Sequence, residues 1–298
     1  MRFKAQGARV FPFFLSPLPS PLFPYNMPMT NPSITFIGGG NMARALIGGL
    51  VEAGHPPGQI TVADPSAVQR NAAESDFGIR SCADNAEAAR ASRVVVLAVK
   101  PQIMNHVLAT LKDVLTPDCL VISVAAGVTL AGLAAGLGND RALVRAMPNT
   151  PALYGAGMTG MVANSKADEQ DRHLTTTILG AAGETIWIED EALMDVVTAV
   201  SGSGPAYFFA LAEHLAAAGE KAGLPAETAA RLARQTAHGA GLMLARSELA
   251  SGELRRRVTS PGGTTEAALN SLDKDEFAAV VLRAIKAAVR RGRELGVG

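Results

Sequence analysis

The sequence has little cysteine, no excess of either charge and no long apolar run. Only two of its 298 residues are cysteine, Cys82 and Cys119, which excludes a disulfide framework and favours a reducing compartment, the cytoplasm. Lysine plus arginine number 27, as do aspartate plus glutamate, which argues against a nucleic-acid scaffold. No apolar run reaches the ~18 residues of a membrane span. The five histidines are scattered without an HExxH pattern, so we predict no metal site.

Residues 1–31 differ in composition from the rest of the chain. They hold five of the ten phenylalanines and six of the 17 prolines, a proline density that breaks helices. The segment opens with basic residues, but prolines interrupt its apolar stretch and no A-x-A cleavage site follows, which disfavours a secretory signal. We favour an N-terminal extension, either disordered or arising from a mis-assigned start with initiation at Met27 or Met29.

A strand, a glycine turn and a helix follow the extension. Residues 33–37 form a short β-rich run, and residues 44–53 have a helical pattern that ends at a glycine. Between them, Gly38, Gly40 and Ala43 fit the G-x-G-x-x-A pattern of a dinucleotide-binding turn. These glycines let the chain turn sharply and let a pyrophosphate approach the N–H groups at the start of the helix.

The next predicted strand, residues 59–63, ends at an acidic residue. Asp64 follows Ala43 by 21 residues, where a carboxylate can accept hydrogen bonds from an adenine ribose. The glycine turn and Asp64 together predict a nucleotide-binding βαβ unit. An ordinary tight turn between a strand and a helix is the alternative interpretation of the glycines.

Further strands and then helices complete the predicted architecture. Apolar, β-branched runs at residues 93–99, 119–124 and 142–147 predict strands that are buried on both faces. Their alternation with alanine-rich segments predicts an α/β, Rossmann-type, doubly wound domain over residues 32–191, with ligand at the carboxyl ends of the strands. Apolar residues at helical spacing predict an all-α domain over residues 192–298.

Two loop features are further candidates for ligand contact. Lys100 follows a predicted strand and either faces a ligand or is a solvated lysine. The segment 259–265, Thr-Ser-Pro-Gly-Gly-Thr-Thr, precedes a helical pattern and exposes several backbone N–H groups, which can hold a carboxylate. Because every helix needs a cap, an ordinary capping turn is an equal alternative.

Taken together, these residues resemble pyrroline-5-carboxylate reductase, and the resemblance covers about residues 33–295. The stretches that carry it, in the order and spacing of that family, are FIGGGNMARALIGGL (36–50), LAVKPQIM (97–104), SVAAGVTL (123–130), RAMPNTPALYGAGMTG (145–160), VSGSGPAYFF (200–209) and TSPGGTTEAAL (259–269). SGSGPAY with SPGGTT is the most specific combination. The resemblance implies reduction of the C=N bond of 1-pyrroline-5-carboxylate by NADPH or NADH to give L-proline, the last step of proline biosynthesis. It further implies a homodimer joined through the helical domain, with five dimers often forming a decamer.

The resemblance also implies which residues form the site. The cofactor-binding residues would be Ile37, Gly38, Gly39, Gly40, Asn41 and Met42 at the pyrophosphate, Asp64 and Asn85 near the adenosine, and Ala98, Val99, Lys100, Pro101, Ala125, Ala126 and Gly127 further along. The substrate carboxylate would meet the backbone of Gly262, Gly263, Thr264 and Thr265, with Glu191 beside the substrate. The hydroxyl of Thr265, directed at the ring nitrogen, is the catalytic candidate and proton donor.

The sequence departs from the family pattern at two places. Asp64 stands where many NADPH-preferring relatives carry Ser or Thr; its charge would repel a 2′-phosphate and favour NADH, which Ser66 and Arg70 could offset. Three arginines at 255–257 stand where relatives often show Lys-Asp-Asn or Lys-Asp-Met. Arg256 replaces the aspartate of that pattern, which argues against the contact that this acid makes near the site in some relatives.

Two alternative functions remain. One is a β-hydroxyacid-dehydrogenase-like enzyme, for which Lys221 is the only loose catalytic candidate, and the other is a non-catalytic cofactor-binding regulator.

Overall fold

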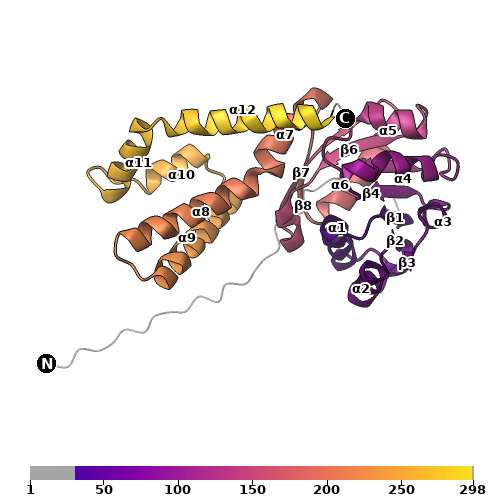
Figure 1. Ribbon diagram of the computed structural model, residues 1–298, viewed down its shortest axis with the longest axis horizontal. Helices are drawn as coiled ribbons and strands as arrows, with labels where there is room; N and C mark the ends of the chain where they lie inside the picture. The colour runs from indigo at the N-terminus through magenta and orange to yellow at the C-terminus, as the bar shows by residue number, and fades with distance from the viewer. Residues whose placement is uncertain (1–30, 297–298) are drawn as a thin grey trace. The chain divides into compact units, whose positions relative to one another are not determined.

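A computed structural model describes residues 31–296, in which the chain forms an eight-stranded sheet followed by a group of helices (Figure 1). The strands are β1 (Ile34–Ile37), β2 (Ile60–Ala63), β3 (Arg80–Cys82), β4 (Val94–Leu97), β5 (Leu120–Ser123), β6 (Leu143–Met147), β7 (Gly157–Ala163) and β8 (Gly183–Trp187). Their order in the sheet is β3-β2-β1-β4-β5-β6-β7-β8. The first six are parallel, β7 runs antiparallel to β6, and β8 runs parallel to β7. The predicted N-terminal extension, apart from its last residue, lies outside the described residues.

The central strands are buried on both faces, as their continuous apolar sequences predict. Every residue of β1, β4 and β5 is buried. Alternate side chains enter two separate cores, so that Phe36 packs on one face of the sheet while Ile37 packs on the other. Each fully buried side chain of this size contributes roughly 1.5–3 kcal/mol of hydrophobic stabilisation.

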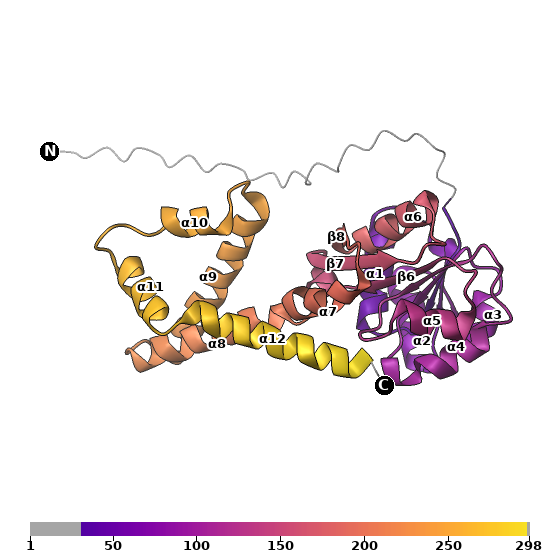
Figure 2. The same cartoon turned by 90° about the horizontal axis from the view of Figure 1, so that it is seen from above.

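Helices cover both faces of the sheet, which confirms the predicted doubly wound fold (Figures 1 and 2). Residues of α1 (Asn41–Glu52), α2 (Ala67–Phe77) and α6 (Glu169–Gly180) belong to the core on one face. Residues of α3 (Asn85–Ala89), α4 (Met104–Leu111) and α5 (Leu130–Leu137) belong to the core on the other. The change of winding direction occurs where β1 lies between β2 and β4, the position at which such sheets open a crevice for a ligand.

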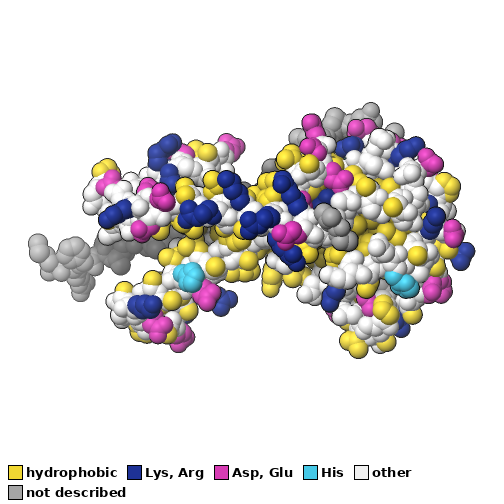
Figure 3. All heavy atoms as spheres, turned by 45° about the horizontal axis from the view of Figure 1, so that its top comes forward, with side chains coloured by type: hydrophobic (Ala, Val, Ile, Leu, Met, Phe, Trp, Pro, Cys, Tyr) yellow, Lys and Arg dark blue, Asp and Glu magenta, His cyan; other side chains and the backbone are white. Residues whose placement is uncertain are grey.

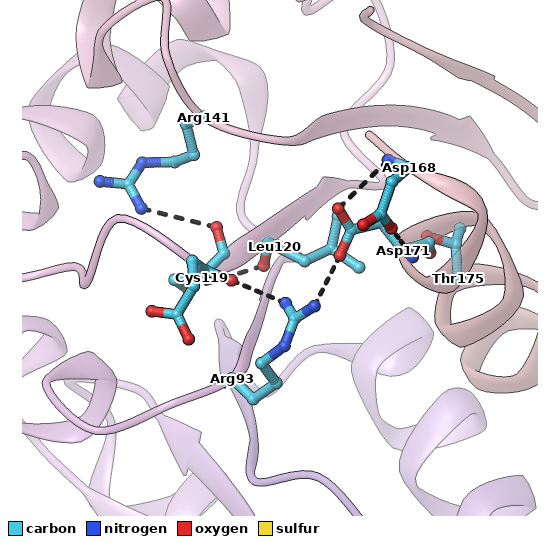
Figure 4. A network of polar contacts seen from close by, with 8 residues as sticks. Arg93, Cys119, Leu120, Arg141, Asp168, Asp171 and Thr175 are labelled. Atoms are coloured by element: carbon cyan, nitrogen blue, oxygen red, sulfur yellow. Dashed lines mark hydrogen bonds and ion pairs between the residues drawn. The ribbon is translucent and has the colours of Figure 1, made fainter. Parts of the chain in front are cut away.

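A polar network closes the amino-terminal edge of the sheet, at the ends of the strands opposite to the glycine turn (Figure 4). Arg93, just before β4, donates to the carbonyl of Asp118 and to Oδ1 of Asp171, each at 2.7 Å. Asp171 belongs to α6 and forms a capping box with Asp168. Because Asp171 is buried, its carboxylate depends on Arg93 for charge compensation. The ion pair therefore fastens α6 to the start of β4, and the hydrogen bond to Asp118 extends the link to the start of β5.

The helices after the sheet bury little of their own surface within one chain. They are α7 (Met194–Val197), a π-turn (Thr198–Gly202), α8 (Gly204–Lys221), α9 (Ala226–Arg246), α10 (Ser251–Arg257), α11 (Thr264–Lys274) and α12 (Phe277–Gly296). Helices α8 and α9 pack as an antiparallel pair around the buried Ala229 and Ala233. None of the helices among residues 31–296 is both long enough and apolar enough to cross a bilayer.

Large apolar side chains on these helices are exposed, as Figure 3 shows over the helical region. Phe208 and Phe209 on α8 are 64% and 68% exposed, and Val280 and Val281 on α12 are each 45% exposed. Apolar residues at helical spacing thus line α12, but most of them are not covered by any other part of residues 31–296. Contiguous apolar surface of this kind marks a contact with another molecule.

Candidate active site

The glycine turn after β1 leaves space at the start of α1. Gly38 has a φ of +99°, and a Cβ there would lie 2.8 Å from the carbonyl oxygen of Ala98. Gly40 is the N-cap of α1 and supplies no side-chain cap, and a Cβ on it would meet no atom within 4 Å. Gly40 and Asn41 are exposed. The first N–H groups of the helix therefore face open space, which fits the pyrophosphate of a dinucleotide.

Asp64 is tied to this turn through both carboxylate oxygens. Its Oδ2 accepts from the N–H of Gly39 and its Oδ1 from the N–H of Ser66, each at 2.8 Å. The guanidinium of Arg70 donates to the carbonyls of Asp64 at 2.8 Å and Pro65 at 3.1 Å. The carboxylate thus shapes the glycine turn and keeps lone pairs for a ribose hydroxyl. Arg70 lies beside it, held by backbone carbonyls.

The remaining predicted cofactor residues follow neighbouring strands at the same edge of the sheet. Those after β4 are Ala98, Val99, Lys100 and Pro101, and those after β5 are Ala125, Ala126 and Gly127. Asn85 begins α3, just after β3, and is half-buried, whereas Lys100 is exposed. The structure therefore brings the predicted cofactor residues together along the carboxyl ends of β1 to β5.

The predicted substrate turn precedes α11 and is already partly hydrogen-bonded. The N–H of Gly262 donates to Oε2 of Glu266 at 2.7 Å, and that of Gly263 donates to the carbonyl of Ser260 at 3.0 Å. Gly263 is the N-cap of α11 and provides no side-chain cap. The N–H groups of Thr264 and Thr265, in the first turn, therefore remain for a ligand. Sequence reasoning missed Glu266, although a Glu three residues after an N-cap is a capping signal.

Glu191 lies apart from this turn within the chain. Its Oε1 accepts from the N–H of Leu130 at 2.8 Å and from the guanidinium of Arg145 at 3.0 Å. These contacts are near the C-terminal end of α12, where Gly292 adjoins Asp195, whereas α11 precedes its N-terminal end (Figures 1 and 2). A helix of this length spans about 30 Å. One chain therefore does not bring Glu191 and the cofactor residues together with Thr265.

Arg145 is a second residue that sequence reasoning missed. It lies inside β6 among apolar residues, and its side chain is 8% exposed. An arginine at a buried strand position needs a charged partner, so the sequence did hold a signal for this contact.

The arginines before the substrate turn are partly neutralised by their own helix. Arg256 and Arg257, on α10, both form ion pairs with Glu253, and together they hold the pKa of that carboxyl below its ordinary value. Arg255 is exposed.

At the amino-terminal edge of the sheet, burial raises the pKa of the Cys119 thiol to about 11, which keeps the thiol protonated and unreactive. Among residues 31–296, no three His, Cys, Asp or Glu side chains gather as a metal site would require.

Family models match both halves of the chain. The model described as "Pyrroline-5-carboxylate reductase dimerisation" matches residues 191–295, and the one described as "NADP oxidoreductase coenzyme F420-dependent" matches residues 33–127. The first match confirms that the predicted helical C-terminal half is of the dimerisation type.

Individual relatives match over nearly their whole length. The chain is 50% identical to pyrroline-5-carboxylate reductase of Pseudomonas aeruginosa over 267 residues, which are 90% of this chain and 98% of the relative. It is 41% identical to that of Pisum sativum, over 90% of this chain and 98% of the relative. Among solved structures, a pyrroline-5-carboxylate reductase from Coxiella burnetii is 42% identical with a TM-score of 0.86, covering 89% of this chain and 98% of that one. The Plasmodium falciparum pyrroline carboxylate reductase with NADP bound is 32% identical with a TM-score of 0.77, over 89% and 98%.

Proposed function

The chain belongs to the pyrroline-5-carboxylate reductase family, and from that membership we propose its reaction, the reduction of 1-pyrroline-5-carboxylate to L-proline by NADPH or NADH. It is an oxidoreductase of proline biosynthesis that acts on a C=N bond. The observation that carries the proposal is the 50% identity to the Pseudomonas aeruginosa reductase over 98% of that protein. Likeness to a 3-hydroxyisobutyrate dehydrogenase, at 17% identity, is a likeness of fold alone.

The cofactor half of the site holds and orients the dinucleotide. The N–H groups at the start of α1 bind the pyrophosphate in the space above Gly40, where helix dipole and donors both favour an anion. Asp64 accepts from the adenosine ribose, with Asn85 nearby. The segments after β4 and β5 line the nicotinamide end. When bound, the cofactor supplies the hydride that adds to the imine carbon.

The substrate half binds the carboxylate and handles the proton. The N–H groups of Thr264 and Thr265 hold the substrate carboxylate at the start of α11, with the dipole of that helix behind them. The hydroxyl of Thr265 donates to the ring nitrogen as the imine becomes an amine, and a water behind it restores its proton. Because the residues of the substrate half include no strong acid, the orientation of the reacting atoms supplies most of the rate enhancement.

A second copy of the chain completes this site. The Thr265 turn and the cofactor residues lie toward opposite ends of α12, and the exposed apolar helices that carry the turn match a dimerisation model. The Thr265 turn of one subunit therefore serves the cofactor bound by its partner. Assembly of five dimers into a decamer and residence in the cytoplasm, which suits two free thiols, are further parts of this proposal.

The direct test of the reaction is oxidation of NADH and of NADPH, measured in parallel with 1-pyrroline-5-carboxylate as acceptor. We expect turnover with both cofactors at unequal rates. Folded protein that binds cofactor but turns over with neither would support a non-catalytic binding protein instead. Turnover with a β-hydroxyacid, but with no cyclic imine, would support the dehydrogenase alternative.

Cofactor choice is expected to depend on the charge of Asp64. Asp64→Asn keeps the size of the side chain and removes its repulsion of a 2′-phosphate, which at the surface is worth about 1–4 kcal/mol. We expect the ratio of kcat/KM for NADPH to that for NADH to rise about tenfold. Asp76→Asn is the matched control, because Asp76 is on the same helix as Arg70 but pairs with Arg44 at the other end. An unchanged ratio in Asp64→Asn would show that Ser66 and Arg70 decide the preference.

A further inference from the structure

A partly buried ion pair joins the sheet to the first residues of the helical half. The Arg145 guanidinium, from the middle of β6, lies 3.0 Å from Oε1 of Glu191 and 3.7 Å from Oδ1 of Asp195. Glu191 is 28% exposed and Asp195 is 20% exposed, so water screens this cluster only in part. A single cation therefore holds two carboxylates from the segment that leaves the sheet.

The same Glu191 oxygen holds the start of α5. It accepts from the N–H of Leu130, the first residue of that helix, at 2.8 Å. The N-cap Thr129 accepts separately from the N–H of Gly132 at 3.0 Å. Glu191 is thus a cap supplied from 61 residues away, and it fixes the end of the segment that runs from β5 through Gly127 to α5.

The last two turns of α12 contact both sides of this cluster. A Cβ on Gly127, whose φ is +77°, would lie 3.4 Å from the carbonyl oxygen of Leu295. A Cβ on Gly292 would lie 3.2 Å from Oδ1 of Asp195. The end of α12 therefore packs close to both Gly127 and Asp195. Four parts of the chain therefore meet here: β6, the segment after β5, the residues around α7, and the end of α12.

We propose that Glu191 and Arg145 are positioning residues that hold the segment after β5, residues 125–129, in place for the nicotinamide end of the cofactor. The proposal rests on the proposed function, in which this segment lines the cofactor. Because β5 lies on the β4–β6 side of the switch point, it is remote from the adenosine site at β2. Loss of the pair therefore affects one end of the dinucleotide and leaves the other unchanged. Glu191 acts on the cofactor through Leu130, without binding the substrate itself.

The test compares two ligands that share the adenosine end. In Glu191→Ala and Arg145→Met we expect the Kd for NADH to rise about tenfold, while the Kd for ADP-ribose, which lacks nicotinamide, stays within about twofold. Glu191→Gln retains an oxygen that can accept from Leu130, and it is expected to recover most of the NADH affinity. Both constants are measured by calorimetry on the full chain without substrate, so absence of turnover with 1-pyrroline-5-carboxylate would leave this readout intact.

The matched control is Arg93→Met, which breaks a partly buried arginine–carboxylate pair at the opposite edge of the same sheet. It is expected to lower Tm without changing either Kd. If Glu191→Ala raised the Kd for NADH and the Kd for ADP-ribose equally, the ion pair would have only a structural role, and the proposal would be overturned. An unchanged NADH affinity with a raised KM for the imine would also overturn it, and would place Glu191 at the substrate.

Discussion

Thr265→Ala is expected to lower kcat for imine reduction by about 10²-fold or more, the usual loss when a positioned proton donor is removed. The substitution removes the hydroxyl and leaves the backbone N–H of residue 265, at the start of α11, free to bind the substrate carboxylate. KM for the substrate should therefore change far less than kcat. Steady-state kinetics separate the two effects. The Kd for NADH should not change, because the cofactor turn is on the other half of the chain.

Thr265→Ser and Thr259→Ala are the two control variants for this result. Serine keeps the hydroxyl and should recover most of kcat. Thr259 precedes the same turn, but its hydroxyl donates to the carbonyl of Arg255 at 2.7 Å, so its loss should leave kcat near the wild-type value. If Thr265→Ala retained the wild-type kcat, the substrate would bind already protonated as its iminium, and the hydroxyl would have no part in the proton transfer.

The parts of the fold that sequence predicted are those encoded locally. The strands β1, β4 and β5 can be recognised in the sequence because burial on both faces requires a continuous apolar run. The three-residue edge strand β3, exposed to half-buried, and the edge strand β8, with alternating exposure, show no such run, and neither was predicted. Edge strands use short or alternating sequences because one side faces water. Their pairing, including the antiparallel β7, is decided by the sheet they join.

The same division applies to the site. The glycine turn, Asp64 and the turn before α11 are local motifs, and the sequence places them on the correct elements. Arg145 in an apolar strand signals the need for a charged partner, but the contacts of Glu191 with Leu130 and Arg145 join residues 61 and 46 positions apart, so no local pattern identifies Glu191 as that partner. The apolar character of Phe208 and Phe209 predicts burial, yet residues 31–296 of one chain leave both side chains exposed.

Mixing two inactive variants is expected to restore activity if each site is built from two subunits. Gly40→Asp is designed to exclude the cofactor without harming the fold. The new side chain meets no atom within 4 Å of its Cβ, caps α1 and brings a negative charge into the pyrophosphate site. Thr265→Ala supplies the second lesion. In a mixed dimer, one site then receives both lesions and the other receives neither.

The expected recovery follows from symmetry. Random pairing of equal amounts makes half the dimers mixed, and half the sites in those dimers are intact, so activity should reach about a quarter of the wild-type value. The fraction is the same in a decamer, because each site still needs only two subunits. Co-refolding the two variants and assaying NADH oxidation measures it, and each variant refolded alone gives the background. If the site were built within one chain, every site in a mixed dimer would carry one lesion, and activity would stay at that background. The recovered fraction therefore reports directly which subunit's Thr265 reaches which subunit's cofactor.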